Sequence, residues 1–329
     1  MLYLSVNKYS LLLAAVCTAT LLVSSPARAA DAGDWPTRPI RLIVPFAPGG
    51  ANDVISRLLA NKLGPVLGQQ VIVDNRGGGG GVIGANLVAT ASPDGNTLMF
   101  NSYSLATGAA ARKTPYDPVK DFAAIGRVAF APLAIVTRTN FPARSVKELV
   151  AYAKANPGKI SYGAAGPGSS QHLVTELFGL TAGIKMEAIH YKGTGPSLID
   201  LIAGRIDLGI TTPTSLSGVG GADKLPKLAF ASAQRLASAP DVPTVREGGI
   251  DFVAEVWWGV FAPRGISNNI RTRLNAEINK IVAEPTFVNL LGAIGATPSP
   301  STPQEMQDIL VKDVQRWTAT AEKAGVRQQ

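Results

Sequence analysis

The sequence predicts an α/β protein of two lobes with a ligand cleft between them. Apolar strand patterns alternate with amphipathic helical patterns after residue 39, which is typical of largely parallel sheets covered by helices on both faces. The alternation falls into two sets, and two strand-like runs at residues 133–137 and 256–262 are suited to crossing between them. A chain of 329 residues has room for two domains with their own cores.

The first set contains short buried strands separated by helical patterns, and the second set repeats this order. In the first set we expect strands at 40–44, 71–74 and 97–101 and helices at 53–63 and 82–91. In the second set we expect strands at 159–162, 185–190, 205–210 and 227–231 and helices at 145–155, 170–180 and 196–203. The chain then ends in helices at 268–282, 285–291 and 303–324.

The two crossings determine the predicted domain organisation. The run at 133–137 carries the chain from the first lobe to the second, and the run at 256–262 returns it. Lobe 1 is therefore expected to be discontinuous, with residues 30–132 plus 256–329. Lobe 2 is expected to be inserted between them, at residues 133–255. The carboxyl ends of the strands are where such α/β lobes bind ligands.

Two segments of the chain, 40–53 and 159–170, share one design. Each runs from an apolar strand through a glycine-rich turn into a helix. Such a turn directs free backbone N–H groups and the positive end of a helix dipole at the space above the strand. Neither turn carries the lysine of a phosphate-binding loop. We therefore expect a small carboxylate, gripped from both sides mainly by peptide N–H groups.

The N-terminus predicts export. Lys8 lies in a short polar start, an apolar run covers residues 11–23, and Ala27-Arg-Ala29 has the pattern of a cleavage site. Residues 1–29 are read as a signal peptide cleaved near Ala29, which gives a periplasmic mature chain. A membrane anchor is the alternative, but the apolar run is shorter than the ~18 residues needed to span a bilayer. A lipoprotein site at Cys17 is weaker, because Cys17 lies within the apolar run.

Composition narrows the possible partners. The formal charge of +8 falls to +6 when the signal peptide is removed, and the remaining Lys and Arg residues are scattered singly. This distribution does not indicate nucleic-acid binding. Cys17, the one cysteine of the sequence, lies in the signal peptide, so the mature chain is expected to have no thiol chemistry. The sequence has two histidines, His172 and His190, which are too few for a multi-histidine metal centre.

Several motifs follow one another along the mature chain. They are PIRLIVPFAPGG at 39–50 with Asp53, GQQVIVDNR at 68–76, SPDG at 92–95, PYDP at 115–118, AKANPG at 153–158, YKG at 191–193, DVPT at 241–244, and Trp258-Gly with Ala262-Pro. In this order they resemble the Bug family, the extracytoplasmic solute receptors of tripartite tricarboxylate transport, and the resemblance covers essentially the whole mature chain.

The resemblance implies a two-lobed periplasmic binding protein of the type II-like fold that closes on a small carboxylate or amino-acid-like ligand. It implies membrane transporter subunits as partners, no cofactor, and a receptor that works as a monomer rather than an enzyme. Matched by position, it implies ligand contacts from lobe 1 at Ala47, Gly49, Gly50, Asn52, Asp53, Asn101 and Ser102. From lobe 2 it implies contacts at Ala164, Ala165, Gly166, Ser169, Ser170, His172, Lys192, Gly193 and Thr212.

Two segments depart from the family pattern. Five glycines at 77–81 stand where relatives have a proline-glycine-alanine type of turn. Relatives often carry an acidic residue and a glycine-lysine-leucine-arginine run at the position where this chain has ITTPTSLSGVGG, residues 210–221. The second departure bears directly on ligand specificity.

Some residues have two readings. Asp53 could bind a ligand ammonium or cap its helix. His172 could face the ligand or cap a turn, and Ser169 and Ser170 read better as helix caps than as nucleophiles. Of the adjacent tryptophans 257 and 258, one is expected to pack and the other to line the cleft, because neighbours on a strand face opposite ways.

Two other functions remain open from the sequence. A periplasmic sensor, or a receptor without its own transporter, would need the same closing cleft. A carboxylate-processing enzyme would need a general base in the cleft, for which Asp53 and His172 are the candidates.

Overall fold

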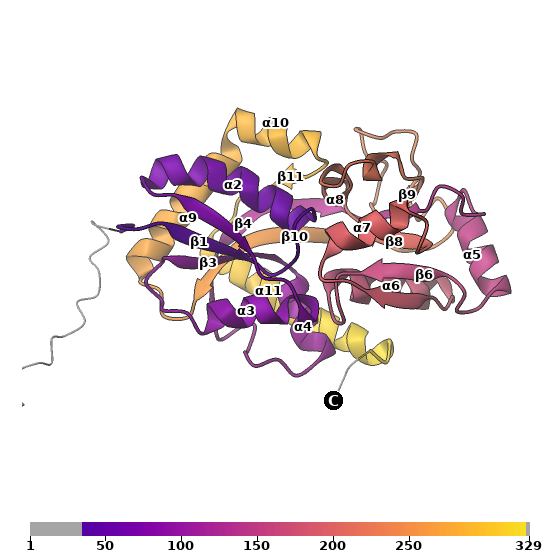
Figure 1. The fold of residues 1–329 in the computed structure, drawn as a ribbon, viewed down its shortest axis with the longest axis horizontal. Coiled ribbons are helices and arrows are strands. Elements are labelled where there is room, and N and C mark those ends of the chain that lie inside the picture. Colours follow the sequence, from indigo (N-terminus) through magenta and orange to yellow (C-terminus); the bar gives the residue numbers. More distant parts are fainter. Residues whose placement is uncertain (1–34, 327–329) are drawn as a thin grey trace, which may run out of the picture. The chain divides into compact units, whose positions relative to one another are not determined.

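The computed structural model describes residues 35–326 (Figure 1). The predicted signal peptide, residues 1–29, lies outside these residues. The residues from Pro36 onward form one compact unit that contains two β-sheets. The expected α/β architecture with two lobes is confirmed, since each sheet forms the centre of one lobe.

The sheet of lobe 1 is mixed rather than largely parallel. Its strand order is β11-β4-β10-β3-β1-β2. Strand β1 runs parallel to β2 and β3, whereas β10 runs antiparallel to β3 and β4. The apolar pattern of β10 predicts a strand, but such a pattern carries no direction. The strands are β1 (Ile40–Val44), β2 (Val71–Asn75), β3 (Thr97–Ser102), β4 (Phe122–Pro132), β10 (Glu255–Pro263) and β11 (Thr297–Pro298).

Helices cover both faces of this sheet. Figure 1 shows α2 and α9 on one side and α3, α4 and α11 on the other. Polar side chains fix where several helices begin: Ser267 caps α9, and Thr302 and Glu305 form a reciprocal capping box at α11. The helices are α2 (Ala51–Leu67), α3 (Val82–Ala89), α4 (Ser104–Ala111), α9 (Asn268–Ala283), α10 (Pro285–Ala293) and α11 (Pro303–Lys323).

Lobe 2 is built on a second mixed sheet with the order β7-β6-β8-β5-β9. Strand β8 is buried at all four residues, which is the pattern of a strand covered on both faces. The strands are β5 (Ala134–Thr137), β6 (Ser161–Ala164), β7 (Glu187–His190), β8 (Leu208–Thr211) and β9 (Lys227–Phe230). The helices are α5 (Val146–Ala155), α6 (Ser170–Ala182), α7 (Thr194–Ile202) and α8 (Pro213–Ser217).

The two lobes are joined where β4 leads into β5 and where the chain returns through β10. At this junction the Leu133 N–H donates to the Ala254 carbonyl, the Ala254 N–H to the Ala231 carbonyl, and the Ala231 N–H to the Leu133 carbonyl. Strands before residue 133 and after residue 254 belong to the first sheet, and those between belong to the second. We therefore keep 30–132 plus 256–329 and 133–255 as the proposed lobe boundaries.

Two elements of lobe 1 carry no clear sequence pattern and were not predicted. Strand β4 has the sequence FAAIGRVAFAP and helix α4 has the sequence SLATGAAA. Both are rich in alanine and glycine, which give neither a clear period of two nor a clear period of 3.6. Their burial against neighbouring elements determines their structure.

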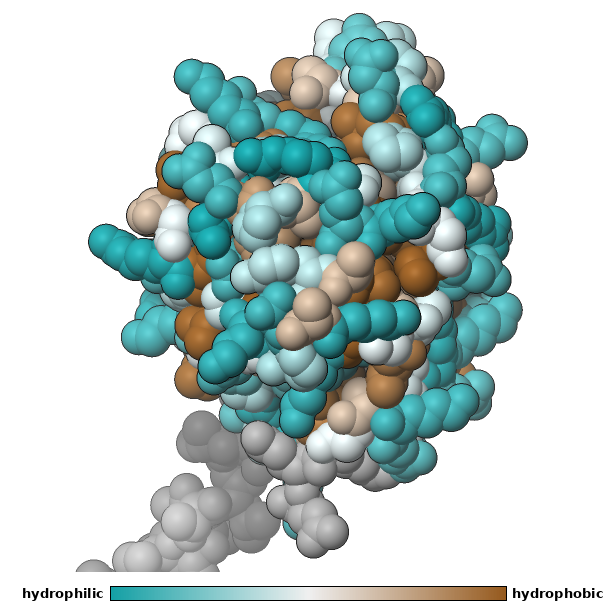
Figure 2. Space-filling view, turned by 90° about the vertical axis from the view of Figure 1, so that its right-hand side faces the viewer, coloured by the Kyte–Doolittle hydropathy of each residue, from teal (hydrophilic) through white to brown (hydrophobic). Residues whose placement is uncertain are grey.

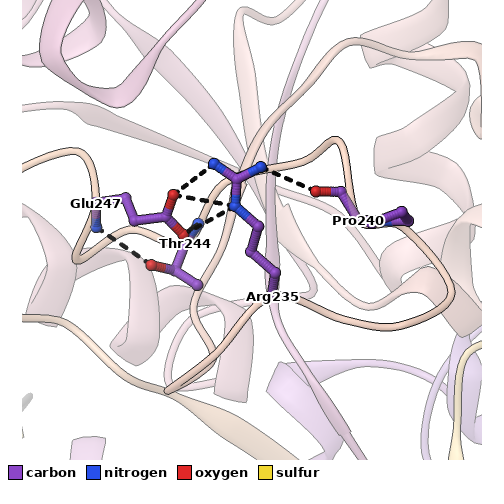
Figure 3. A network of polar contacts seen from close by, with 4 residues as sticks. All are labelled: Arg235, Pro240, Thr244 and Glu247. Atoms are coloured by element: carbon purple, nitrogen blue, oxygen red, sulfur yellow. Dashed lines mark hydrogen bonds and ion pairs between the residues drawn. The ribbon is translucent and has the colours of Figure 1, made fainter.

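A long irregular connection follows β9 and is held by one arginine (Figure 3). The Arg235 guanidinium donates to the Glu247 carboxylate and to the Pro240 carbonyl. Glu247 also accepts from the Thr244 N–H, while its own N–H donates to the Thr244 hydroxyl. The hydrogen bond from Arg235 is the main cause that lowers the pKa of Glu247 to about 2. The pairing thus ties the two ends of the connection together.

The surface of the described residues is mostly polar. Figure 2 shows one face, on which hydrophilic side chains surround small, separate apolar patches. Among residues 35–326, no helix is both long and apolar enough to cross a membrane.

Candidate ligand-binding site

A small cavity of about 30 Å³ lies between the two lobes. A volume of this size holds about two water molecules. Both lobes and the crossing strands contribute to its wall. None of the described residues that line it carries a charged side chain. The lining residues are Ala51, Asn52, Ser102, Tyr103, Leu133, Ser170, Gln171, Thr194, Thr211, Thr212, Ser215, Val256 and Trp258.

Four helices of eight or more residues begin at this cavity. Its wall includes the first residues of α2, α6 and α7, namely Ala51, Ser170 and Thr194, and the residue before α4, Tyr103. Each helix start carries a partial positive charge equivalent to roughly half an elementary charge. Burial raises the pKa of the Tyr103 phenol, so this group stays a neutral donor. The cavity wall is therefore electrostatically positive without a cationic side chain.

Two buried side-chain oxygens on the wall have no hydrogen-bond partner within the described residues. They are Asn52 Oδ1 in lobe 1 and Thr211 Oγ1 in lobe 2. An unsatisfied buried polar group costs about 1–3 kcal/mol. Both residues line the cavity. The threonine hydroxyl can donate to a bound anion, whereas the asparagine oxygen can only accept.

Hydrogen bonds connect the two lobes beside the cavity. The Ala51 N–H donates to Ser215 Oγ at 3.1 Å, and Ser104 Oγ donates to Ser170 Oγ at 2.9 Å. Both bonds join a residue of lobe 1 to a residue of lobe 2. The lobes are therefore in contact around the cavity.

Backbone also meets backbone across the lobes, at what we call the glycine interface: Gly49 and Gly80 of lobe 1 against Gly166, Gly195 and Gly218 of lobe 2. A Cβ on Gly166 would lie 2.6 Å from the Gly80 nitrogen, and a Cβ on Gly218 would lie 2.6 Å from the Gly49 carbonyl oxygen. Real Cβ atoms do not come this close to backbone. The absence of side chains at these positions allows the lobes to meet.

The structure divides the residues predicted for the site into three groups. Four line the cavity: Asn52, Ser102, Ser170 and Thr212. Six lie where the lobes touch beside it: Ala47, Gly49, Gly50, Gly166, Lys192 and Gly193. The remaining six are buried behind the cavity wall: Asp53, Asn101, Ala164, Ala165, Ser169 and His172.

Nine lining residues are not among the predicted contacts, and most of them adjoin a predicted position. Thr194 follows Gly193, Thr211 precedes Thr212, and Tyr103 follows Ser102. Strand ends and helix starts thus mark the cavity wall, and extending each by one residue would have found these. Leu133 and Val256 lie at the crossing strands, where position in the sequence gave the only signal, and Trp258 is one of the two tryptophans of which one was expected to line the cleft.

The two tryptophans point to different sides of β10. Trp258 lines the cavity and is only 1% exposed. Trp257 instead donates its Nε1–H to Asp313 Oδ2 at 2.6 Å. Burial raises the pKa of the Asp313 carboxyl, to which this bond gives a partner. One tryptophan therefore packs away from the cavity and the other contributes to its wall.

Asp53 is engaged within its own lobe. Its carboxylate accepts from the Gly49 N–H at 3.1 Å and from Arg57 Nε at 2.9 Å, and its side chain is almost fully buried. These bonds fix the glycine turn to the first turn of α2. The geometry favours the capping interpretation of this residue.

Asp53→Asn is expected to lower the free energy of unfolding by about 1 kcal/mol, because the ion pair with Arg57 and the favourable charge at a helix start are both lost. The fall in stability should appear in thermal melting, and purely anionic and zwitterionic ligands should be affected alike. Asp251→Asn is the control, since Asp251 is 84% exposed and pairs only at the surface. A selective loss of zwitterionic ligands at unchanged stability would contradict this prediction.

His172 stabilises the second glycine turn through a hydrogen bond inside lobe 2. Its Nδ1 accepts the Gly168 N–H at 3.1 Å, and its own N–H is capped by Ser169 Oγ. The ring lies edge-on to that of His190 at 4.9 Å. The pKa of His172 is lowered to about 4, mainly by burial and to a smaller extent by the nearby His190 and Arg112. His172 is therefore a neutral acceptor near pH 7.

Within residues 35–326, no group of three or more His, Cys, Asp or Glu residues is arranged to hold a metal ion.

Two lobes that meet around a neutral polar cavity, joined by crossing strands, define the class of periplasmic solute-binding proteins. The chain belongs to the tripartite tricarboxylate transporter family of receptors, TctC, whose family model matches residues 55–326. It is therefore a receptor and not an enzyme, as the motifs indicated.

Individual relatives agree with this membership. The protein BugT of Bordetella pertussis is 37% identical over 301 residues, which are 90% of this chain and 92% of BugT. The structure of the periplasmic binding protein BugD is 34% identical, with a TM-score of 0.85 over 90% of this chain and 100% of BugD. The structure of Rpa4515 of R. palustris with adipate is also 34% identical, with a TM-score of 0.85 over 89% of this chain and 99% of Rpa4515.

Proposed function

We propose that this chain is a periplasmic receptor that closes its two lobes on a small carboxylate and delivers it to the membrane subunits of a tripartite transporter. One observation carries the proposal: four helix starts meet at one cavity between the lobes, together with the Thr211 hydroxyl, which has no partner among the described residues and can donate to an anion. Helix N-termini bind anions through free N–H groups and the helix dipole. The relative from R. palustris, whose structure holds adipate, supports a carboxylate as the ligand class.

Neutral hydrogen-bond donors can supply the affinity expected for a carboxylate ligand. A hydrogen bond to a charged partner contributes about 1.5–3 kcal/mol, so four would give roughly 6–12 kcal/mol before the entropy of association and desolvation. Micromolar binding needs about 8 kcal/mol. A cavity of about 30 Å³ is smaller than a dicarboxylate, so the lobes must part to admit the ligand.

The proposed contacts combine the four predicted lining residues, Asn52, Ser102, Ser170 and Thr212, with neighbours on the same wall such as Thr211. The other twelve predicted residues act in this proposal by shaping the turns and the lobe contact. Export through the signal peptide at residues 1–29 is part of the proposal, as is a receptor that works as a monomer.

The test is calorimetry against mono-, di- and tricarboxylates, after native mass spectrometry of the purified protein to find a retained ligand. Thr211→Val should weaken the best ligand at least ~10-fold, because one hydrogen bond to a charged partner is lost. Thr137→Val is a matched control: Thr137 also has a buried, unpartnered hydroxyl among the described residues but does not line the cavity.

Two results would contradict the proposal. One is the failure of every carboxylate in the panel to bind. The other is an equal effect of Thr211→Val and Thr137→Val on affinity, since only Thr211 of this pair faces the proposed site.

A further inference from the structure

Arg112 reaches from lobe 1 to lobe 2 outside the cavity. It follows α4 at the C-cap position, and its Nη2 donates to the carbonyl of Pro167, in the turn between β6 and α6. Its Nε is buried without a partner among the described residues. Arg112 does not line the cavity. The contact therefore holds the lobes together without touching a ligand there.

The turn that Arg112 grips is enclosed on its other sides as well. The backbone of Gly80 packs directly against the Pro167 carbonyl, and a Cβ on Gly168 would lie 2.8 Å from the Cβ of Ala111. The same turn leads into α6, whose first residue, Ser170, lines the cavity. The position of this turn therefore decides both whether the lobes are closed and where a helix start faces the ligand.

His172 supports the turn from inside lobe 2, through the bond from the Gly168 N–H to Nδ1. Four titratable or charged groups face its ring. They are Arg112 after α4, His190 on β7, Tyr162 on β6 and Glu176 on α6, and Tyr162 stacks at 6.5 Å and donates its hydroxyl to Glu176. Of these, only Arg112 belongs to the opposite lobe. The cation next to His172 thus arrives when the lobes close.

We infer that Arg112 is a positioning residue that latches the closed lobes over the ligand, and that protonation of His172 releases the latch. The inference rests on the proposed function, since the latch acts on ligand capture. A protonated His172 can no longer accept the Gly168 N–H, and its charge lies beside Arg112 and His190. Protonation removes this hydrogen bond in both forms, because it lies inside lobe 2, but only the closed form also gains repulsion from Arg112.

The sign of the pH effect follows from this geometry. Closure lowers the pKa of His172, because Arg112 approaches it only in the closed form. The open form therefore binds the proton more readily, and closure is weakened as the pH falls toward about 4, the pKa of His172 in the closed form. Each half unit of difference in pKa between the two forms changes the equilibrium by about threefold. Ligand affinity should fall with the pH in the same range.

The experiment measures binding and release of the best carboxylate from the panel by stopped-flow tryptophan fluorescence and calorimetry at pH 7.5 and 4.5. Arg112→Ala should speed dissociation about tenfold and leave the association rate within about twofold, because the latch forms after encounter. Arg112→Lys should be intermediate. Arg205→Ala is the control, since Arg205 is exposed and pairs with Asp200 inside lobe 2.

The pH profile separates a latch from a merely structural role. The wild-type affinity should fall between pH 7.5 and 4.5, by up to about threefold for each half unit of pKa difference, and Arg112→Ala should flatten this fall. His172→Asn should flatten it too, because an asparagine can accept the Gly168 N–H but does not titrate. The ranking of carboxylates should be unchanged in Arg112→Ala.

The outcomes decide the inference independently of the proposed function. Dissociation within twofold of wild type in Arg112→Ala, or a changed ranking of ligands, would overturn the latch. If no carboxylate binds the wild type, the proposed function fails, and the latch is then judged by hydrogen exchange of residues 165–169. Faster exchange there in Arg112→Ala but not in Arg205→Ala supports the latch, and equal exchange refutes it.

Discussion

Replacing Gly166 with valine (Gly166→Val) is expected to weaken carboxylate binding by more than ~100-fold, equivalent to about 2.7 kcal/mol, while the chain still folds. Gly166 has φ of +108°, and a Cβ on it would lie 2.6 Å from the backbone nitrogen of Gly80 on the other lobe. Backbone cannot move aside as a flexible side chain can, so the lobes cannot close. Calorimetry with the best ligand of the wild type measures the loss.

Gly183→Val is the matched control for Gly166→Val. Gly183 also has a positive φ, +64°, but among the described residues no atom lies within 4 Å of the position that a Cβ would take there. Both variants should lose about 1–2 kcal/mol of stability from the strained backbone, and only Gly166→Val should lose binding. Retained affinity in Gly166→Val would show that closure does not use the glycine interface.

Trp258→Ala is expected to lower the free energy of unfolding by about 3–5 kcal/mol, the usual range for removing a large buried aromatic side chain. Trp258 is 1% exposed on β10, between β3 and β4, and its indole forms part of the cavity wall. The substitution should also weaken ligand binding, because the enlarged cavity no longer matches its ligand. Urea denaturation and calorimetry measure the two effects.

Trp257→Ala is the comparison for Trp258→Ala. It removes an indole from the neighbouring position, where Nε1 bonds to Asp313 away from the cavity. Trp257→Ala should therefore lower stability without changing which carboxylates bind. A stability loss below about 1 kcal/mol in Trp258→Ala would contradict the packing described for this side chain.

Much of the fold was predictable because its strands and helices have strong apolar periods. The strands at 40–44 and 71–74 and the returning strand at 256–262 all appear in the structure, as β1, β2 and β10. The mixed sheet was not predictable, since a strand pattern does not tell in which direction the strand runs. Strand β4 and helix α4 were missed because alanine and glycine give no period.

The site was predictable only in part, because its wall forms when two lobes meet. Ser170 and Thr212 could be found as caps or starts of helices that follow strands. The role of Gly166 could not, because the sequence shows only a glycine turn, whereas in the structure a Cβ on this residue would meet the backbone of Gly80 on the other lobe. Which surface faces a turn depends on the opposite lobe, and local sequence does not encode that.

The glycine interface has a consequence for redesign of this protein. Its contacts are made by main-chain atoms, whereas the cavity is lined mainly by side chains such as Asn52, Gln171 and Thr211. At the glycine interface, contact between the lobes thus depends on residues that do not line the cavity. Exchanging cavity side chains should retarget the receptor while preserving its motion, so the fold is suited to fluorescent reporters in which one hinge movement signals many different acids.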